Sequence, residues 1–354
     1  MMHYYAINKF MIEIVGHQQI VYEEKNLQGK FCIDPWQRIS ITESGDVYSC
    51  PCVDWNTLLI GNVLETPLEE IYNNSANLKK LRDSVLDGKF GWCKVGQCDR
   101  INNLPNIKKI DMLRIKHADH FFLPTYINMG IEYNCNLKCG SCRNELHYLS
   151  RENAQVTKIL SNLVNSYKDY KHITELAIDG YGEIFTSKSY MNLLFSDKLP
   201  DCWRFMVQTN GNLLSKRKKE ILALKDRINL VNISLDASTP ETYKIVRGGN
   251  WNIVMDGLEM INELGIKGMI QFVLQRENYH DLIEFKNIAN KFNFWYQIQF
   301  MDKREHMTEA YWSHNRIHNN TNVDYIKLKE YLDVLNQDPN CKFDGGVQEV
   351  YSNL

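Results

Sequence analysis

The chain has 354 residues, a formal net charge of −2 and a hydrophobic content of 44%. This length and apolar fraction allow one large α/β domain and a smaller one, and they exclude a disordered or fibrous protein. The near-zero charge provides no basic field, so we expect neither nucleic acid nor a membrane as a partner.

The start of the chain lacks a basic segment followed by a continuous apolar run, as a secretory signal would have. No stretch approaches the roughly 18 apolar residues of a membrane span. We therefore expect a cytoplasmic protein, in which the ten cysteines serve as thiolate ligands rather than disulfides.

After an N-terminal segment (1–29), residues 30–102 form a cysteine-rich unit. Its cysteines are Cys32, Cys50, Cys52, Cys93 and Cys98. Between them, Leu78, Leu81 and Val85 recur at helical spacing, which predicts a helix. Such thiolates can bind an iron-sulfur cluster or form a zinc ribbon, because the two kinds of site share ligand chemistry.

A linker (103–123) with mixed charges leads into alternating strand and helix patterns, which are typical of a βα repeat. We predict six strands, at 126–133, 173–179, 203–209, 229–236, 268–275 and 295–301.

The local signals between the strands predict helices. Ser238 or Thr239 can cap a helix that has Pro240 in its first turn and ends at Gly265. Right-handed crossovers then place the carboxyl ends of the strands at one rim. We therefore predict a partial (β/α)6 TIM-like barrel over 124–301, and a C-terminal extension (302–354) that could act as a lid.

Cys135, Cys139 and Cys142 follow the first of these strands in a Cys-x3-Cys-x2-Cys array. Three thiolates in one short loop can hold three irons of a [4Fe-4S] cube and leave the fourth iron open, which favours chemistry over a structural role. The alternatives are a zinc knuckle that takes His147 as its fourth ligand, and a set of unrelated buried cysteines.

The predicted strands alternate polar and apolar side chains. On the fourth strand, Asn232, Ser234 and Asp236 share one face. The polar residues predicted to point inward on the other strands are Asn128, Glu132, Gln208, Asn210, Gln271, Gln275, Gln297 and Gln299. Burial of unpaired amides would cost about 1 to 3 kcal/mol each, so we predict a solvated cavity for a polar cofactor and substrate. An error of one residue in a strand's register would instead turn its polar side chains to solvent.

The cysteine loop resembles that of the radical S-adenosylmethionine (SAM) enzymes, and matching segments continue to about residue 300. This resemblance implies a [4Fe-4S] cluster whose open iron binds SAM, and one-electron cleavage of SAM to a 5'-deoxyadenosyl radical. Ser141 stands where the family usually has an aromatic residue, so the adenine contact normally made there is in question.

The same resemblance implies a set of SAM-binding residues. They are Gly180, Tyr181, Gly182, Glu183, Asn210, Ser234, Asp236 and Arg247. In the family, the turn that corresponds to 180–183 receives the SAM amino group, and here Tyr181 replaces one of its glycines. Ser234 and Asp236 take the place of ribose contacts, and Arg247 is similar to an arginine that approaches the SAM carboxylate.

Residues 30–102 resemble the SPASM or twitch auxiliary-cluster domain, which family members usually carry after the barrel. The resemblance implies one auxiliary [4Fe-4S] cluster on Cys32, Cys50, Cys93 and Cys98, with Cys52 as a rival to Cys50. A zinc ribbon is the alternative.

The resemblance also bears on the reaction. A fully ligated auxiliary cluster can accept or pass an electron, which favours net oxidation. The implied substrate is a peptide modified by oxidation, crosslinking or epimerisation, or a sugar or aminocyclitol that is dehydrogenated. The implied electron donor is a protein such as flavodoxin or ferredoxin. Cys341 could quench a substrate radical, as an epimerase requires. A non-catalytic iron-sulfur or zinc-binding protein is the alternative of another class.

Overall fold

The structure is a computed structural model. It describes the chain apart from residues 1–4, 8–9, 16–17, 52–57, 95–97, 99, 102–103, 109–122, 179–181, 305, 318–323, 345–346 and 348–354, and it describes residues 5–23 by their backbone alone. The chain divides into two compact units. Unit 1 comprises 1–131, 155–176 and 200–203, and unit 2 comprises 132–154, 177–199 and 204–354.

Unit 1 contains antiparallel and parallel strand pairs. Its strands are β1 (Tyr5–Ile7), β2 (Phe10–Val15), β3 (Gln18–Glu23), β4 (Arg38–Thr42), β5 (Asp46–Ser49), β6 (Leu59–Asn62) and β7 (Tyr126–Gly130). β1, β2 and β3 form an antiparallel meander. β4 pairs parallel with β7 and antiparallel with β5, which in turn pairs antiparallel with β6.

The helices of unit 1 pack on an apolar core. They are α1 (Asp34–Gln37), α2 (Leu68–Asn74), α3 (Ala76–Leu86) and, apart from its first residue, α5 (Ala154–Tyr167). α3 confirms the predicted helix, because Leu78, Leu81 and Val85 are all buried on one face. Val85 packs in one core cluster with Phe31 and Trp36, next to the cysteines of the unit.

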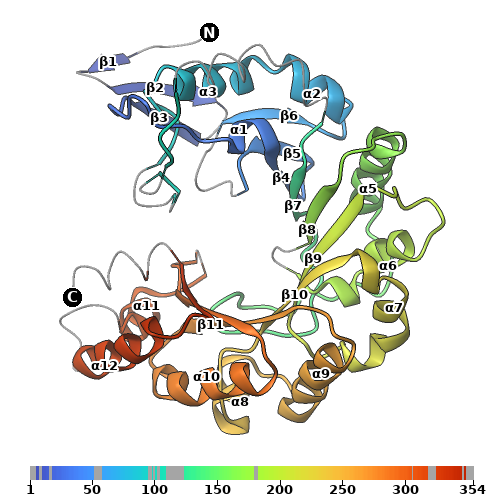
Figure 1. Ribbon diagram of the computed structural model, residues 1–354, viewed down its shortest axis with the longest axis vertical. Helices are drawn as coiled ribbons and strands as arrows, with labels where there is room; N and C mark the ends of the chain where they lie inside the picture. The colour runs from blue at the N-terminus through green and yellow to red at the C-terminus, as the bar shows by residue number, and fades with distance from the viewer. Residues whose placement is uncertain are drawn as a thin grey trace. The chain divides into compact units, whose positions relative to one another are not determined.

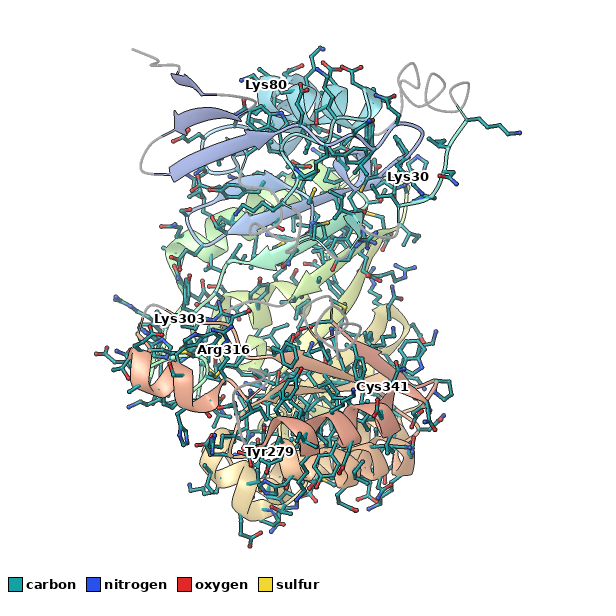
Figure 2. The ribbon with its side chains drawn as sticks, turned by 90° about the vertical axis from the view of Figure 1, so that its left-hand side faces the viewer. Lys30, Lys80, Tyr279, Lys303, Arg316 and Cys341 are labelled. Carbon is teal, nitrogen blue, oxygen red and sulfur yellow. The ribbon has the colours of Figure 1, made fainter. Side chains whose placement is uncertain are left out.

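Unit 2 is a parallel α/β unit. β8 (Thr174–Ile178) and β9 (Trp203–Thr209) have residues in both units, and the strands that follow are β10 (Ile228–Ser234), β11 (Gly268–Leu274), β12 (Trp295–Phe300) and β13 (Cys341–Phe343). Strands β9 to β13 are neighbours in chain order, and every pairing among them is parallel. Cys341, labelled in Figure 2, opens β13.

Helices join the parallel strands of unit 2. They are α6 (Lys188–Leu194), α7 (Lys218–Ala223), α8 (Pro240–Val246), α9 (Trp251–Glu263), α10 (Leu282–Lys291), α11 (Glu309–Asn315) and α12 (Tyr325–Asn336). In Figure 1, α8, α9 and α10 lie on the same side of β10 and β11. The apolar face of β10 is fully buried, with Val231, Ile233 and Leu235 at most 1% exposed. This arrangement confirms the predicted α/β class of parallel strands joined by helices.

The prediction of one helix from Pro240 to Gly265 is wrong. Thr239 does cap α8, accepting a hydrogen bond from the Thr242 backbone N–H at 3.1 Å. However, the helix ends at Val246, because Gly248 adopts a φ of +71° that breaks the helical path. Asn250 then caps a second helix, α9.

All six predicted strands are present, as β7 to β12; β9 matches its predicted range, and the boundaries of the others differ by at most three residues. Other elements were not predicted. The N-terminal segment contributes the β1–β3 meander, and the C-terminal extension contributes α11, α12 and a seventh parallel strand, β13. Most of the predicted linker (103–123) lies outside the described residues.

Candidate functional site

The three-cysteine loop opens unit 2. Cys135 and Cys139 are buried, at 7% and 6% exposure, whereas Cys142 is exposed. The loop is held by its own backbone. The Cys135 N–H donates to the His147 carbonyl at 2.7 Å, and the Cys142 N–H donates to the Cys139 carbonyl at 3.0 Å. These bonds present three sulfurs from one short turn.

Nitrogen donors are aimed at two of these sulfurs. The Leu137 N–H and the Asn210 amide lie 3.5 and 3.8 Å from Cys135 Sγ, and an Arg143 guanidinium nitrogen lies 3.7 Å from Cys142 Sγ. Burial raises the pKa of Cys139 to about 11, so this sulfur stays a thiol until a metal displaces its proton. Hydrogen bonds to sulfur are typical of thiolates that ligate iron-sulfur clusters.

The three cysteines line one cavity of about 220 Å³. Its other walls come from the parallel strands and from the segment that follows β12. Those wall residues include Gly182, Gln208, Asn210, Ser234, Arg247, Gln271, Gln299, Asp302 and Arg304. Among the described residues, no three cysteine, histidine or acidic side chains converge on one point as the ligands of a single metal ion do.

Arg247 lines this cavity and forms a buried ion pair with Asp236. Arg247 Nη1 lies 2.9 Å from Asp236 Oδ2, and the Asp236 side chain is fully buried. Burial raises the pKa of Asp236, while the Arg247 charge and the Val273 N–H, which donates to Oδ1 at 2.7 Å, oppose that rise. Asp236 also has a φ of +57°, a left-handed conformation that aspartate tolerates better than most residues.

Arg247 retains an unused donor. Its Nε is buried and has no hydrogen-bond partner in the described part of the chain. An unpaired buried N–H is costly, so this group is suited to an acceptor that the protein itself does not supply. The observation fits an anionic ligand group at this wall of the cavity.

The Glu183 carboxylate already accepts hydrogen bonds from other groups of the protein. It accepts from the Asn210 N–H at 2.6 Å, from the Thr209 hydroxyl at 2.8 Å and from the Phe185 N–H at 3.3 Å. Burial raises its pKa, and the same hydrogen bonds lower it. The side chain is 1% exposed and is not part of the lining of the cysteine cavity. Glu183 therefore ties the turn after β8 to the end of β9.

Gly182 is needed for close backbone approach. A Cβ at this position would lie 2.5 Å from the Glu132 carbonyl and 2.8 Å from the Asn134 carbonyl. The next residue, Glu183, donates its N–H to the Asn134 carbonyl at 2.7 Å. The turn thus packs directly on the start of the cysteine loop. The other two residues of the predicted turn, Gly180 and Tyr181, lie outside the described residues.

Asn210 connects several parts of the site. Its amide donates to Asn136 Oδ1 at 2.8 Å as well as facing Cys135, and its own Oδ1 accepts from the Asn212 N–H at 3.0 Å. Asn212 in turn donates to the Tyr243 hydroxyl at 2.6 Å. The end of β9 is therefore fixed to the cysteine loop and to α8.

Amide side chains form a ladder across the sheet face of unit 2. Asn232 donates to Gln208 at 3.0 Å, Gln208 to Gln271 at 2.5 Å, and Gln271 to Gln297 at 3.1 Å. This order follows from strand register, since Asn232 is paired with Gln208 and Gln271 with Gln297. Gln208 and Gln271 line the cavity. The predicted polar cavity wall is confirmed for these strands.

The segment after β12 contributes residues that the sequence did not single out. Asp302 and Arg304 line the cavity. Further along, His306 Nε2 lies 3.4 Å from the Gly140 carbonyl, and a Cβ at Gly140 would lie 2.8 Å from the hydroxyl of Tyr311 of α11. This segment therefore covers part of the cysteine loop. In the chain, Lys303 comes before His306 and Arg316 comes after Tyr311. Both Lys303 and Arg316 are labelled in Figure 2.

Two other residues that support the site were also missed, Thr209 and Arg143. Thr209 directly follows Gln208 in β9, so strand alternation, which selected Gln208, gave no reason to select it. Arg143 directly follows the third cysteine, and that adjacency was the only available signal.

In unit 1, the other predicted ligands pack in two core clusters that have Cys93 in common. Cys32, Cys93 and Cys98 pack against one core cluster, and Cys50 and Cys93 share the adjacent one. Burial, followed by the neighbouring Cys32, raises the pKa of Cys93 to about 12. Cys50 is buried and has a φ of +75°, which is uncommon for a residue with a side chain. The rival ligand, Cys52, lies outside the described residues.

Two family models match this chain. Residues 131–289 match the radical SAM superfamily, and residues 32–99 match SPASM, an iron-sulfur cluster-binding domain. The chain belongs to the radical SAM superfamily and carries its SPASM domain ahead of the radical SAM domain. These matches confirm the predicted cofactors, which are SAM, the [4Fe-4S] cluster that binds it, and an auxiliary iron-sulfur cluster.

Curated relatives cover part of the chain. A probable GTP 3',8-cyclase of Methanococcus aeolicus is 28% identical over 200 residues, which is 54% of this chain and 64% of that protein. A GTP 3',8-cyclase of Limosilactobacillus fermentum is 30% identical over 172 residues, or 47% of this chain and 50% of that one. The chain thus spans 64% and 50% of the length of these two relatives.

Among solved structures, Streptococcus suis SuiB bound to its precursor peptide SuiA matches with a TM-score of 0.49 and 17% identity, covering 89% of this chain and 73% of SuiB.

A separate observation concerns membranes. None of the helices in the described part of the chain has the length and apolar character that a membrane span requires.

Proposed function

We propose that this protein is a radical SAM enzyme that removes hydrogen from a polar substrate, a peptide. The observation that carries the proposal is the shared cavity, in which three loop cysteines face a buried arginine and a wall of amides. We assign the auxiliary domain to 30–102, the linker to 103–123 and the radical SAM domain to 124–301.

The cysteine loop would hold the first cluster. Cys135, Cys139 and Cys142 supply three thiolates, and the nitrogen donors of Leu137, Asn210 and Arg143 stabilise negative charge on two of them. When bound, this cluster and SAM supply a 5'-deoxyadenosyl radical by one-electron cleavage of the sulfonium.

The surrounding residues would bind and orient SAM. The unpaired Arg247 Nε is suited to its carboxylate. Ser234 lines the same cavity and suits a ribose hydroxyl, whereas the Asp236 carboxylate is already used by Arg247 and Val273. The Glu183 carboxylate already accepts hydrogen bonds from the protein, and it could bind the SAM amino group only by sharing an oxygen with one of these donors. We therefore assign to Glu183 first the role of positioning Asn210.

The amide ladder bears on substrate class. Gln208, Gln271 and Gln299 line the cavity with groups that both donate and accept hydrogen bonds, as peptide amides and sugar hydroxyls do. This wall suits the peptide substrate that we propose, and it also suits the alternative, a sugar or aminocyclitol.

A nucleotide is a second candidate substrate, supported by the names of the curated relatives, which are GTP 3',8-cyclases. Arg143 and Arg304 also line the cavity, and guanidinium groups are common phosphate ligands.

The auxiliary site would act in electron transfer. Cys32, Cys50, Cys93 and Cys98 can saturate a second [4Fe-4S] cluster, which cannot then bind substrate but can take one electron. Removal of a hydrogen atom from the substrate followed by loss of one electron is a net oxidation. We therefore propose dehydrogenation or oxidative crosslinking, with a flavodoxin or ferredoxin as the external electron donor.

Metal analysis separates this proposal from a zinc-binding protein. Anaerobic reconstitution with iron and sulfide should give about eight irons per chain, following cubane stoichiometry. The variant with Cys135, Cys139 and Cys142 replaced by alanine should retain about four. Protein that binds zinc and no iron in both forms would contradict the proposal.

The substrate is found by isotope transfer. Deuterated peptides, aminocyclitols and GTP are incubated separately with reconstituted enzyme and reductant, and 5'-deoxyadenosine is examined by mass spectrometry. Deuterium should enter 5'-deoxyadenosine with a peptide. Transfer only from GTP would replace the peptide proposal with the nucleotide one.

A further inference from the structure

A buried carboxylate lies among the auxiliary cysteines. Asp34 is 1% exposed and stands two residues after Cys32 in the chain. It opens α1, and Trp36 of the same helix packs in the apolar cluster that also contacts Cys32, Cys93 and Cys98. Little water reaches such an apolar region to screen a charge. The electrostatic interaction of the Asp34 carboxylate with neighbouring groups is therefore stronger than it would be at the surface.

Two arginines fix the position of this carboxylate. Arg100 forms a two-pronged contact, with Nε 3.1 Å from Asp34 Oδ2 and Nη1 3.2 Å from Oδ1. Arg38 Nε lies 3.0 Å from Oδ1. The fork geometry of Arg100 leaves the carboxylate little freedom to rotate. The charge therefore occupies a defined place beside the sulfurs.

Asp34 is close to the auxiliary cysteines both in the chain and in the packing. Cys32 precedes it by two residues, and Arg100, which holds its carboxylate, follows Cys98 by two residues. The apolar cluster that contains Trp36 of the same helix contacts Cys32, Cys93 and Cys98. The Asp34 carboxylate is therefore placed beside three of the four proposed ligands.

We propose that Asp34 and its two arginines set the reduction potential of the auxiliary cluster, with Asp34 lowering that potential and Arg100 raising it. This inference rests on the proposed cluster at Cys32, Cys50, Cys93 and Cys98. One-electron reduction adds a negative charge to the cluster, and a fixed carboxylate nearby opposes that gain. Asp34 thereby favours the oxidised cluster, which is the form that can accept an electron during substrate oxidation.

The test uses the full-length chain with Cys135, Cys139 and Cys142 replaced by alanine, so that only the auxiliary cluster remains. The midpoint potential is measured by dithionite titration, in which each cluster gains one electron and the signal of the reduced form is followed by electron paramagnetic resonance. Asp34→Asn should raise the ratio of reduced to oxidised cluster about tenfold at a fixed potential, which is 59 mV for a one-electron couple. Arg100→Gln should lower the potential.

Asp83→Asn is the matched control. It also removes one carboxylate from unit 1, but Asp83 pairs with Lys79 on α3 and its side chain is 41% exposed. It should leave the potential unchanged. If Asp34→Asn does not retain iron, the test depends on Arg100→Gln alone. The Arg100 side chain is half-exposed, so its replacement should disturb the fold less than a change at the buried Asp34.

Opposite shifts in Asp34→Asn and Arg100→Gln support the inference. Unchanged potentials with full iron content would overturn it and leave the proposed function standing, as would shifts of the same sign. A parent variant that binds no iron at all would instead remove the auxiliary cluster, and both proposals for this site with it.

Discussion

Asp236→Asn is the substitution that tests the cavity wall most sharply. Asparagine tolerates the φ of +57° at this position, and its oxygen can still accept from the Val273 N–H. What changes is the charge opposite Arg247, whose Nη1 lies 2.9 Å from the present carboxylate. The variant therefore removes the anion with little change in shape.

The expected cost follows from burial. The side chains of Arg247 and Asp236 are 11% and 0% exposed, so the arginine cannot recover its lost partner from water. Removing one member of a buried ion pair typically costs 3 to 5 kcal/mol, and we expect a fall of about 3 kcal/mol in the free energy of unfolding. Glu220→Gln is the control. It breaks the partly exposed Arg217–Glu220 pair and should cost less than about 1 kcal/mol.

The assay is urea denaturation of the protein without cofactors. The double variant Asp236→Asn with Arg247→Met should recover part of the loss, because no unpaired charge remains buried. A loss below about 1 kcal/mol for Asp236→Asn, or no recovery in the double variant, would show that this pair does not carry the energy assigned to it.

Three other changes should have distinct effects. Gly182→Ala places a Cβ 2.5 Å from the Glu132 carbonyl, so it should lower stability by about 1 to 3 kcal/mol and reduce iron uptake at the first cluster, measured by denaturation and iron analysis; normal iron uptake would count against the packing assigned to this turn. Burial raises the pKa of Glu183 above its ordinary value of 4.5, so its stabilising contribution is present below that pH and is lost as the pH rises through the folded value. Glu183→Gln should flatten this part of the stability profile, and an unchanged slope would contradict it. Gln271→Leu interrupts the amide ladder and should impair deuterium transfer from substrate much more than SAM cleavage without substrate; equal loss of both would place Gln271 in SAM binding instead.

Periodicity and turn residues were enough to predict the parallel α/β part of the fold. The strands β7 to β12 follow alternation of polar and apolar residues, and the amide ladder follows from that alternation together with in-register pairing. The break between α8 and α9 was missed, because Gly248 and Gly249 lie inside a run that otherwise continues the helical pattern. β1 and β13 were missed because strands of three residues carry little periodic signal.

The candidate site was predictable where ligands are close in the chain. Cys135, Cys139 and Cys142 belong to one short motif, whereas the cavity position of Arg304 depends on where the chain turns after β12. The hydrogen-bond partners of Glu183 could not be predicted from the sequence either. They depend on Thr209 and Asn210, at the end of the neighbouring strand β9, lying close enough to the Glu183 carboxylate to donate. The pairing of Asp34 with Arg100 is of the same kind, as 66 residues separate them.

Reductive SAM cleavage by matched cysteine variants tests the central claim most directly. Reconstituted protein is incubated anaerobically with SAM and dithionite, and 5'-deoxyadenosine is quantified. The account predicts product from the unmodified chain and from a Cys32→Ala, Cys93→Ala variant, and none from the variant that lacks Cys135, Cys139 and Cys142. Undiminished 5'-deoxyadenosine from that last variant would contradict the assignment of the loop.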